Sequence, residues 1–231
     1  MEDNILKGVI FDFDGVIVDT EPLHYRSFQV VLEPLGLGYS WEAYVERYMG
    51  FDDRDAFVEA FRAGGRTLDH DALEELIALK AKLFQDVVAG GVTAYPGVVD
   101  LISALSSELP LAICSGALRS DIEPILHQLA IDNAFSAMVT AEEVAASKPD
   151  PASYALAAKK LAVAFPGSGI LPSGCVAIED TPAGIASAAG AGIPVLAVTN
   201  SYPAEQLGSA QRIVSSLADI SIADLKKIVS Y

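Results

Sequence analysis

Short apolar runs that alternate with helical patterns fill the chain from Tyr95 onward, and they limit its possible folds more than any other feature. Four such runs occupy Leu111–Ser115, Ala137–Thr140, Cys175–Asp180 and Pro194–Val198. Segments with helical periodicity lie between them, at residues 119–130, 151–164 and 182–192. Continuous apolar strands joined by helices form parallel sheets that are buried on both faces. With a first strand at Lys7–Phe13, the pattern predicts a doubly wound, Rossmann-like α/β core.

Residues 20–92 have a different pattern, with apolar residues at three- and four-residue spacing. Glycines interrupt the pattern at residues 36, 50, 64–65 and 90–91, where helices are expected to end. This helical block follows the first strand directly. We therefore predict a core formed by residues 1–19 and 93–231, and an inserted helical cap domain at 20–92. The cap is expected to move as a lid on hinges near Asp19–Thr20 and Val92–Tyr95.

Composition excludes several classes of function. Apolar residues make up 52% of the 231 positions, but no apolar run is long enough to span a bilayer. The net charge of −16 provides no basic surface for a nucleic acid. Cys114 and Cys175 lie in apolar runs and are expected to be buried free thiols, which suits a reducing compartment. The start of the chain does not resemble a secretory signal. We therefore expect a cytoplasmic monomer that binds neither nucleic acid nor membrane.

Two carboxylates interrupt the first apolar run, in the stretch FDFDGVIVDTEPLH. Asp12 and Asp14 are two residues apart, so in a strand they point to the same face. One interpretation is structural, because Asp-Gly between alternating apolar residues favours a hairpin turn. The other is functional, because two close carboxylates repel each other unless they hold a cation. Both can hold together if the turn at Asp14–Gly15 begins a small hairpin flap between core and cap.

Polar residues also follow the later strands, where ligands bind in open α/β sheets. Ser115 and Gly116 follow one strand, just before a helix whose N-terminus would favour an anion. Glu179–Asp180 end another strand, and Lys148 precedes the helix expected near Pro151. Taken singly, the serine and the acidic pair could be helix caps and the lysine a solvated surface residue. Together, these acids, the hydroxyl and the lysine indicate a site for Mg²⁺ and a phosphate group.

The motifs Asp-x-Asp-Gly-Val, Ser-Gly, Lys-Pro-x-Pro and Glu-Asp, in this order, resemble the haloacid dehalogenase superfamily of phosphotransferases. The resemblance covers the whole chain, including the helical cap, and is strongest to the β-phosphoglucomutase-like branch. It implies that Asp12 is the nucleophile that forms an aspartyl-phosphate and that Asp14 is the general acid/base. It also implies that Ser115, Gly116 and Lys148 bind the transferring phosphoryl group.

The same resemblance implies a Mg²⁺ cofactor. Asp12, the backbone carbonyl of Asp14 and Asp180 correspond to the metal ligands of the family, and Glu179 corresponds to a supporting position beside the metal. A dehalogenase is a poorer match, because its reaction needs neither Asp14 nor a metal. A signalling receiver domain has a similar acid cluster, but it is about half as long and has no cap.

The remaining alternatives are a phosphatase for a small phosphorylated metabolite, possibly a sugar phosphate, and a sugar-phosphate mutase of the β-phosphoglucomutase type. Thr20, Glu21 and His24 agree with the mutase, as do Gly50 and Lys80 in the cap. For His24 and Lys80, a solvated helix face is an equally good interpretation.

A mutase needs a cation in the cap to hold a second phosphate. In the register set by Gly50, Asp53 occupies the position of the expected arginine and Met49 that of a lysine. Arg54 is one residue away, which on a helix rotates it by about 100°. We therefore favour the phosphatase, although a shifted register that used Arg54 would restore the mutase.

Overall fold

A parallel sheet forms the core of the protein in the computed structural model, which describes residues 5–229. Within these residues the sheet has six strands in the order β3-β2-β1-β4-β5-β6, and every neighbouring pair is parallel. The strands are β1 (Gly8–Phe11), β2 (Leu111–Cys114), β3 (Ala137–Val139), β4 (Cys175–Glu179), β5 (Val195–Val198) and β6 (Arg212–Val214). The predicted doubly wound α/β fold is thus confirmed, with β6 as a strand that the sequence patterns did not indicate.

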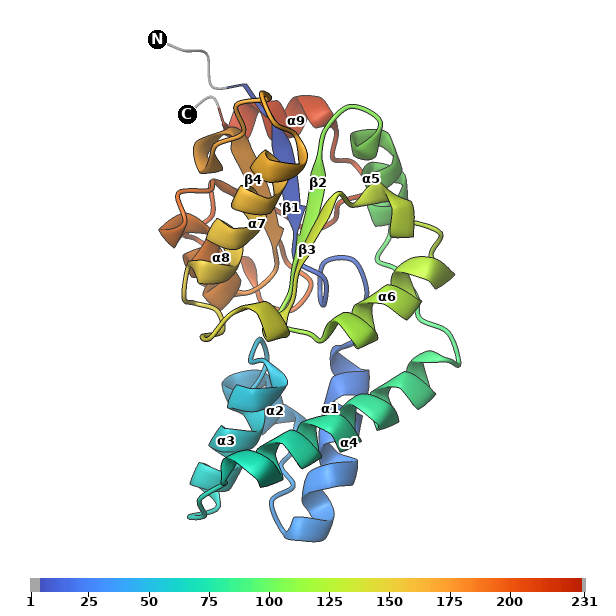
Figure 1. Ribbon diagram of the computed structural model, residues 1–231, viewed down its shortest axis with the longest axis vertical. Helices are drawn as coiled ribbons and strands as arrows, with labels where there is room; N and C mark the ends of the chain where they lie inside the picture. The colour runs from blue at the N-terminus through green and yellow to red at the C-terminus, as the bar shows by residue number, and fades with distance from the viewer. Residues whose placement is uncertain (1–4, 230–231) are drawn as a thin grey trace.

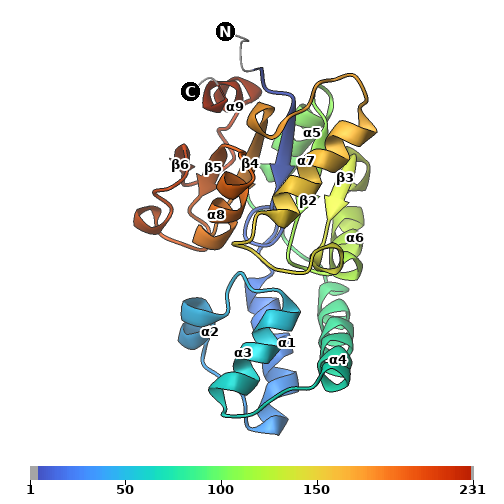
Figure 2. The ribbon, with the colours of Figure 1, turned by 60° about the vertical axis from the view of Figure 1, so that its left-hand side comes forward.

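The strand order places a crevice at the centre of the sheet. The chain builds outward from β1 through β2 and β3 on one side, and through β4, β5 and β6 on the other. At such a point the connections of neighbouring strands leave in opposite directions and open a space beyond their carboxyl ends. In Figure 2 the carboxyl ends of the strands point toward the helical cap. The space therefore lies between core and cap.

Alternating side chains divide the core into two layers. Val9 and Phe11 of β1 belong to one apolar cluster, which is covered by α5 (Val98–Ser106), α6 (Arg119–Gln128) and α9 (Ile222–Ile228). Ile10, between them, belongs to a second cluster, covered by α7 (Ala152–Ala164) and α8 (Pro182–Gly190). Cys114 and Cys175 lie in this second layer as buried free thiols, as expected. Because both faces are covered, the central strands β1, β2, β4 and β5 are apolar up to the last residue of β4, which is Glu179.

Four helices make up the cap, which lies at one end of the long axis in Figure 1. They are α1 (Glu21–Leu32), α2 (Trp41–Arg47), α3 (Asp53–Ala63) and α4 (His70–Val88). The side chains of Ser40, Asp52 and Asp69 cap the last three by accepting a hydrogen bond from a backbone N–H in the first turn. The helices enclose an apolar cluster of their own that includes Phe28, Leu32 and Phe57.

The two connections between core and cap run side by side. Val18 and Ala94 form an isolated antiparallel bridge, and the Tyr95 amide donates to the Ile17 carbonyl at 2.9 Å. The last turns of α4 also pack on the core, because Phe84 and Val88 belong to the same cluster as Val18. Rotation of the cap would therefore bend both connections at the same place.

The segment after β1 differs from the expected hairpin flap. Its backbone closes a single tight turn, in which the Ile17 amide donates to the Phe13 carbonyl at 2.8 Å and the Gly15 amide donates to the Val18 carbonyl at 2.9 Å. Val16, Ile17 and Val18 are fully buried. A hairpin would carry these apolar side chains out of the core, so the chain turns inward and the prediction of a flap was wrong.

Among residues 5–229, no helix is both long and apolar enough to cross a membrane.

Candidate active site

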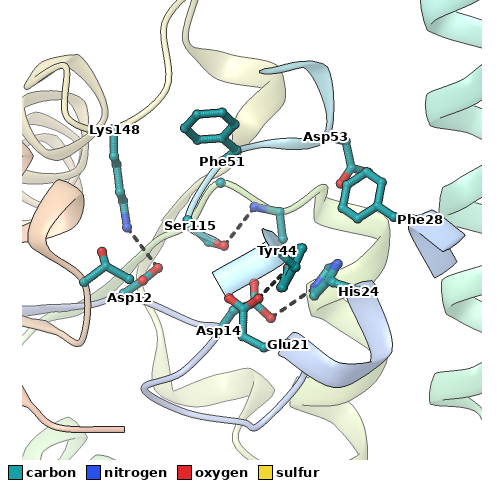
Figure 3. A pocket seen from close by; sticks show the side chains of 14 residues that line it. Asp12, Asp14, Glu21, His24, Phe28, Tyr44, Phe51, Asp53, Ser115 and Lys148 are labelled. Atoms are coloured by element: carbon teal, nitrogen blue, oxygen red, sulfur yellow. Dashed lines mark hydrogen bonds and ion pairs between the residues drawn. The ribbon is translucent and has the colours of Figure 1, made fainter. Parts of the chain in front are cut away.

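The predicted polar residues of the core meet at the carboxyl edge of the sheet. Asp12 follows β1, Ser115 follows β2, and Glu179–Asp180 end β4. Lys148 comes from the loop before α7, and its Nζ reaches Asp12 Oδ1 at 2.9 Å (Figure 3). This convergence follows from the sheet, because the ends of parallel neighbouring strands lie at one edge.

Lys148 ties three strand ends together. Besides Asp12, its ammonium group donates to Glu179 Oε1 at 2.7 Å and to the Cys114 carbonyl at 3.0 Å. Burial alone would lower the pKa of this lysine, but the charges of Asp12 and Glu179 outweigh burial and hold the pKa well above its ordinary value. Lys148 is therefore a permanently charged ammonium group beside the Asp12 carboxylate.

Glu179 is fully buried, and protein groups occupy both of its oxygens. Oε1 accepts from Lys148 and from the Tyr154 hydroxyl at 2.8 Å. Oε2 accepts from the Thr181 hydroxyl at 3.1 Å. Gly184 makes room for this carboxylate, because a Cβ at that position would lie 1.9 Å from Oε1. Glu179 thus holds Lys148 in position from beneath the site.

Asp180 is almost as buried as Glu179, but it has a free oxygen. The Ser201 hydroxyl donates to its Oδ2, whereas Oδ1 is buried with no hydrogen-bond partner in the described structure. Gly15 packs against this carboxylate with a φ of +78°, and a Cβ there would lie 1.9 Å from Oδ2. Asn200 holds the turn from the other side by donating to the Gly15 carbonyl at 2.6 Å.

The acid cluster has more negative than positive charges. One oxygen each from Asp12, Glu179 and Asp180 lie within 4.8 Å of one another, with one lysine among them. Burial and the charge of Glu179 raise the pKa of Asp12 to about 8, and burial and the charge of Asp12 raise the pKa of Asp180 well above its usual range. In the ionised form that binds a metal, three carboxylates and one ammonium group leave two negative charges uncompensated, and without a cation this excess charge favours protonation of Asp12 and Asp180. A divalent cation that binds oxygen ligands fits this deficit and the unpaired Asp180 oxygen.

Asp14 points away from this cluster and toward the cap. The Thr20 hydroxyl donates to its Oδ1, and His24 Nε2 lies 3.3 Å from the same oxygen. Burial alone would raise the pKa of Asp14, but its interactions with His24 and with the Thr20 hydroxyl outweigh burial and lower the pKa. The structure therefore favours the carboxylate form, which can accept a proton.

A polar chain extends from Asp14 through the cap. Lys80 Nζ lies 2.8 Å from His24 Nδ1 and 2.7 Å from Asp53 Oδ1. An ammonium group can only donate, so Nδ1 is the acceptor and Nε2 carries the proton that points to Asp14. Lys80 is fully buried, and the His24 ring stacks on Phe84 at 4.1 Å between centroids. A solvated helix face is therefore excluded for both His24 and Lys80.

The structure also shows where two other predicted residues of the cap, Gly50 and Arg54, lie relative to the pocket. Gly50 lines the pocket beside Asp14 and His24, whereas Arg54 is not among the residues that line it. Arg54 instead donates to the Ala145 carbonyl of the core at 3.2 Å. In this arrangement the first turn of α3 directs Arg54 to the core loop and away from the pocket lining, so a contact of Arg54 with substrate stays a prediction. The helix after Ser115 begins at Arg119, as the sequence pattern indicated, and the Ser115 hydroxyl accepts from the Ala117 amide at 3.0 Å.

Comparison with known proteins agrees with this geometry. The sequence profile of the family described as haloacid dehalogenase-like hydrolase matches residues 9–198. This chain belongs to that family. It is 31% identical to the fructose-1-phosphate phosphatase YqaB of Escherichia coli, over 83% of this chain and 95% of that protein. It is 29% identical to hexitol phosphatase A of the same species, over 94% of each chain.

The fold is shared with solved structures of the same kind. The crystal structure of β-phosphoglucomutase from Clostridium difficile superposes with a TM-score of 0.85, covers 97% of each chain and is 20% identical in sequence. At this identity the similarity concerns the fold alone.

Several residues of the hydrolase site were not predicted from the sequence. Asn200 and Ser201 follow β5, so the rule that found Asp12 and Asp180 could have found them as well. Tyr154 and Gly184 belong to helices, and no local pattern marks them as partners of Glu179. Glu21 was noted only for its resemblance to the mutase, but it lines the pocket and accepts a bond from the Tyr44 hydroxyl at 2.5 Å.

The pocket between the two parts of the hydrolase is nearly closed, with a free volume of about 50 Å³. That space holds one or two waters, each of which occupies about 30 Å³, whereas sites for small ligands typically measure about 300–1,000 Å³. Bonds such as those from Arg54 to Ala145 and from Tyr202 to Val45 hold the cap against the core. We therefore expect the cap to open when a substrate enters.

We predict that small-angle scattering of the free protein shows a larger radius of gyration than this closed structure. Addition of Mg²⁺ with a phosphate analogue should reduce it, because the ligand bridges core and cap. Arg54→Ala should raise the value for the free protein, since it removes two bonds to the core loop. Identical scattering curves in all of these states would contradict a hinged cap.

Proposed function

We propose that this hydrolase is a Mg²⁺-dependent phosphatase of small phosphorylated metabolites that works through an aspartyl-phosphate on Asp12. The observation that carries the proposal is the pairing of the buried Asp12 carboxylate with Lys148, beside a cluster that lacks two positive charges. Relatives named as phosphatases of a phosphorylated sugar and of hexitols support the same chemistry. We take the enzyme to be a cytoplasmic monomer, which agrees with its two buried free thiols.

In the first step, Asp12 attacks the phosphorus atom of the substrate. Lys148 and the Phe13 amide both donate to Asp12 Oδ1, at 2.9 and 2.8 Å, so they fix the carboxylate and leave Oδ2 to form the new bond. Lys148 and Ser115 lie where they can bind the phosphoryl oxygens, and Gly116 contributes backbone to the same side of the pocket. Such preorganised donors stabilise charge on the transferring group.

Asp14 then serves both proton transfers. It takes up a proton when the substrate binds and gives that proton to the leaving oxygen, and as a carboxylate it then takes one from the water that attacks the phosphorylated Asp12. His24 and Thr20 hold its side chain, and Lys80 fixes which nitrogen of His24 faces it. Because Thr20 lies at the first connection to the cap and Lys80 on α4, the position of the cap governs the orientation of Asp14.

The metal site is proposed to consist of Asp12, Asp180 and the backbone carbonyl of Asp14, with Glu179 as support. Bound Mg²⁺ supplies positive charge for the phosphate oxygens and offsets the repulsion between the phosphate and Asp12. Glu179 itself is occupied by Lys148, Tyr154 and Thr181, so its role is to hold Lys148 beside the cluster.

We predict that saturating Mg²⁺ raises the melting temperature by several degrees relative to protein in chelator, because it compensates the buried negative charge. Asp180→Asn should abolish most of this shift, and in chelator it should be at least as stable as the wild type, since it removes one of three repelling charges. Asp86→Asn, on the exposed side of α4, is the matched control and should keep the shift. An equal Mg²⁺ shift in Asp180→Asn would exclude the proposed metal site.

A phosphatase is favoured over a mutase because no lysine or arginine of the cap is among the described residues that line the pocket. Lys148 is the only lysine or arginine among the described residues that line the pocket, and it belongs to the core. Asp53 occupies the position where a mutase is expected to have an arginine, and Arg54 is bound to the core loop. A second phosphate in the cap would therefore meet a carboxylate.

We predict that a panel of sugar and polyol monophosphates releases free phosphate with Mg²⁺ present. β-Glucose 1-phosphate with a trace of glucose 1,6-bisphosphate should give free phosphate faster than glucose 6-phosphate, if it reacts at all. Coupled assays for glucose 6-phosphate and for inorganic phosphate measure the two products. Glucose 6-phosphate as the main product would identify a mutase and reject the phosphatase.

A further inference from the structure

One oxygen on the cap side of the pocket has no partner. Asp53 lines the pocket together with Asp12 and Lys148, and its side chain is only 14% exposed. Its Oδ1 accepts from Lys80, but its Oδ2 is buried and makes no hydrogen bond to any described residue. A buried acceptor without a donor costs free energy, about as much as a hydrogen bond contributes or more. Such an oxygen calls for a partner that the protein itself does not supply, and in a pocket wall a bound ligand can supply it.

We propose that Asp53 determines specificity by accepting a hydrogen bond through Oδ2 from a hydroxyl on the leaving group of the substrate. The inference rests on the proposed phosphatase function and extends it, because it states which chemical group the cap side of the site recognises. Asp53 belongs to the first turn of α3, and in Figure 3 it lies on the opposite side of the pocket from Lys148. The hydroxyl that it binds is therefore remote from the phosphate held by the core.

A hydroxyl fits this oxygen better than either charged alternative. A second phosphate would bring two negative charges to a carboxylate, and Glu21 and Asp14 add further negative charge to the same pocket. An ammonium group would stand close to Lys80, whose charge already pairs with the same carboxylate at 2.7 Å. A neutral donor satisfies Oδ2 without adding charge of either sign.

The surroundings of Asp53 also keep Oδ2 in place. Lys80 is held between Asp53, His24 Nδ1 and the rings of Phe28 and Phe84, with its Nζ 5.0 and 5.1 Å from the two ring centres. Because Lys80 is fully buried, it cannot turn away without leaving an unpaired charge in the cap. The carboxylate therefore has one oxygen fixed by Lys80 and one oxygen without a partner, in a side chain that lines the pocket.

The test compares ligands that differ only in their remote groups. Straight-chain polyol monophosphates of three to six carbons are matched with alkyl phosphates of the same length and with the corresponding polyol bisphosphates. Binding is measured by calorimetry with Mg²⁺ on the Asp12→Asn protein, so that it does not depend on turnover. We expect at least one polyol monophosphate to bind about 10- to 100-fold more tightly than its alkyl match, the range for one hydrogen bond to a charged acceptor. The bisphosphate should bind more weakly than the monophosphate.

Adding Asp53→Asn to the Asp12→Asn protein should reduce the preference for the polyol to less than about threefold and should improve binding of the bisphosphate. Asp86→Asn is the control and should retain the preference. If Asp53 serves only to hold Lys80, Asp53→Asn will weaken all three ligands by the same factor, and that result would overturn the proposal. So would an absence of polyol preference in the protein with Asp53 intact.

The phosphatase function is tested separately by release of phosphate from the wild-type enzyme. Polyol preference without phosphate release would leave the role of Asp53 intact and reject the phosphatase. Phosphate release without polyol preference would support the phosphatase and reject the proposed role of Asp53.

Discussion

The structure depends on one electrostatic constraint, the burial of three carboxylates against a single lysine. Asp12, Glu179 and Asp180 come together because β1 and β4 are neighbours at the centre of the sheet, and Lys148 reaches two of them at 2.9 and 2.7 Å. Such a cluster destabilises the fold unless a cation joins it. In the proposed enzyme, stability and activity therefore both require a cation at this cluster. The glycines at 15 and 184 leave room for two of the carboxylates, because side chains there would collide with Asp180 and Glu179.

A second set of contacts links the cap to the chemistry. Asp14 is oriented by Thr20, in the connection to the cap, and by His24, whose tautomer is set by Lys80. Lys80 in turn is fixed by Asp53, which faces the substrate side of the pocket. In the proposed enzyme, a group bound at the cap could thus influence the proton donor through a continuous series of hydrogen bonds.

The sequence predicted the fold and the hydrolase family well, because both are recorded in local patterns. Apolar runs alternate with helical periods, and acids and hydroxyls follow the strands that meet at one edge. Side-chain placement in the cap was harder to predict. Asp53 and Arg54 are adjacent in sequence, and only the rotation of α3 against the core directs one into the pocket and the other to the Ala145 carbonyl. The pairing of Lys80 with Asp53 joins separate helices, so no local sequence pattern indicates it. The turn after Phe13 was mistaken for a hairpin because burial of Val16–Val18 overrides the local Asp-Gly signal.

The central claim, that Asp12 carries the phosphoryl group, is tested most directly by trapping the intermediate. A polyol monophosphate labelled in its phosphate is mixed with enzyme and Mg²⁺, quenched in acid within milliseconds, and the labelled peptide is identified by mass spectrometry. We expect an acid-stable, hydroxylamine-labile adduct on Asp12, which Asp12→Asn abolishes together with phosphate release. Label on another residue, or phosphate release by Asp12→Asn at the wild-type rate, would contradict it.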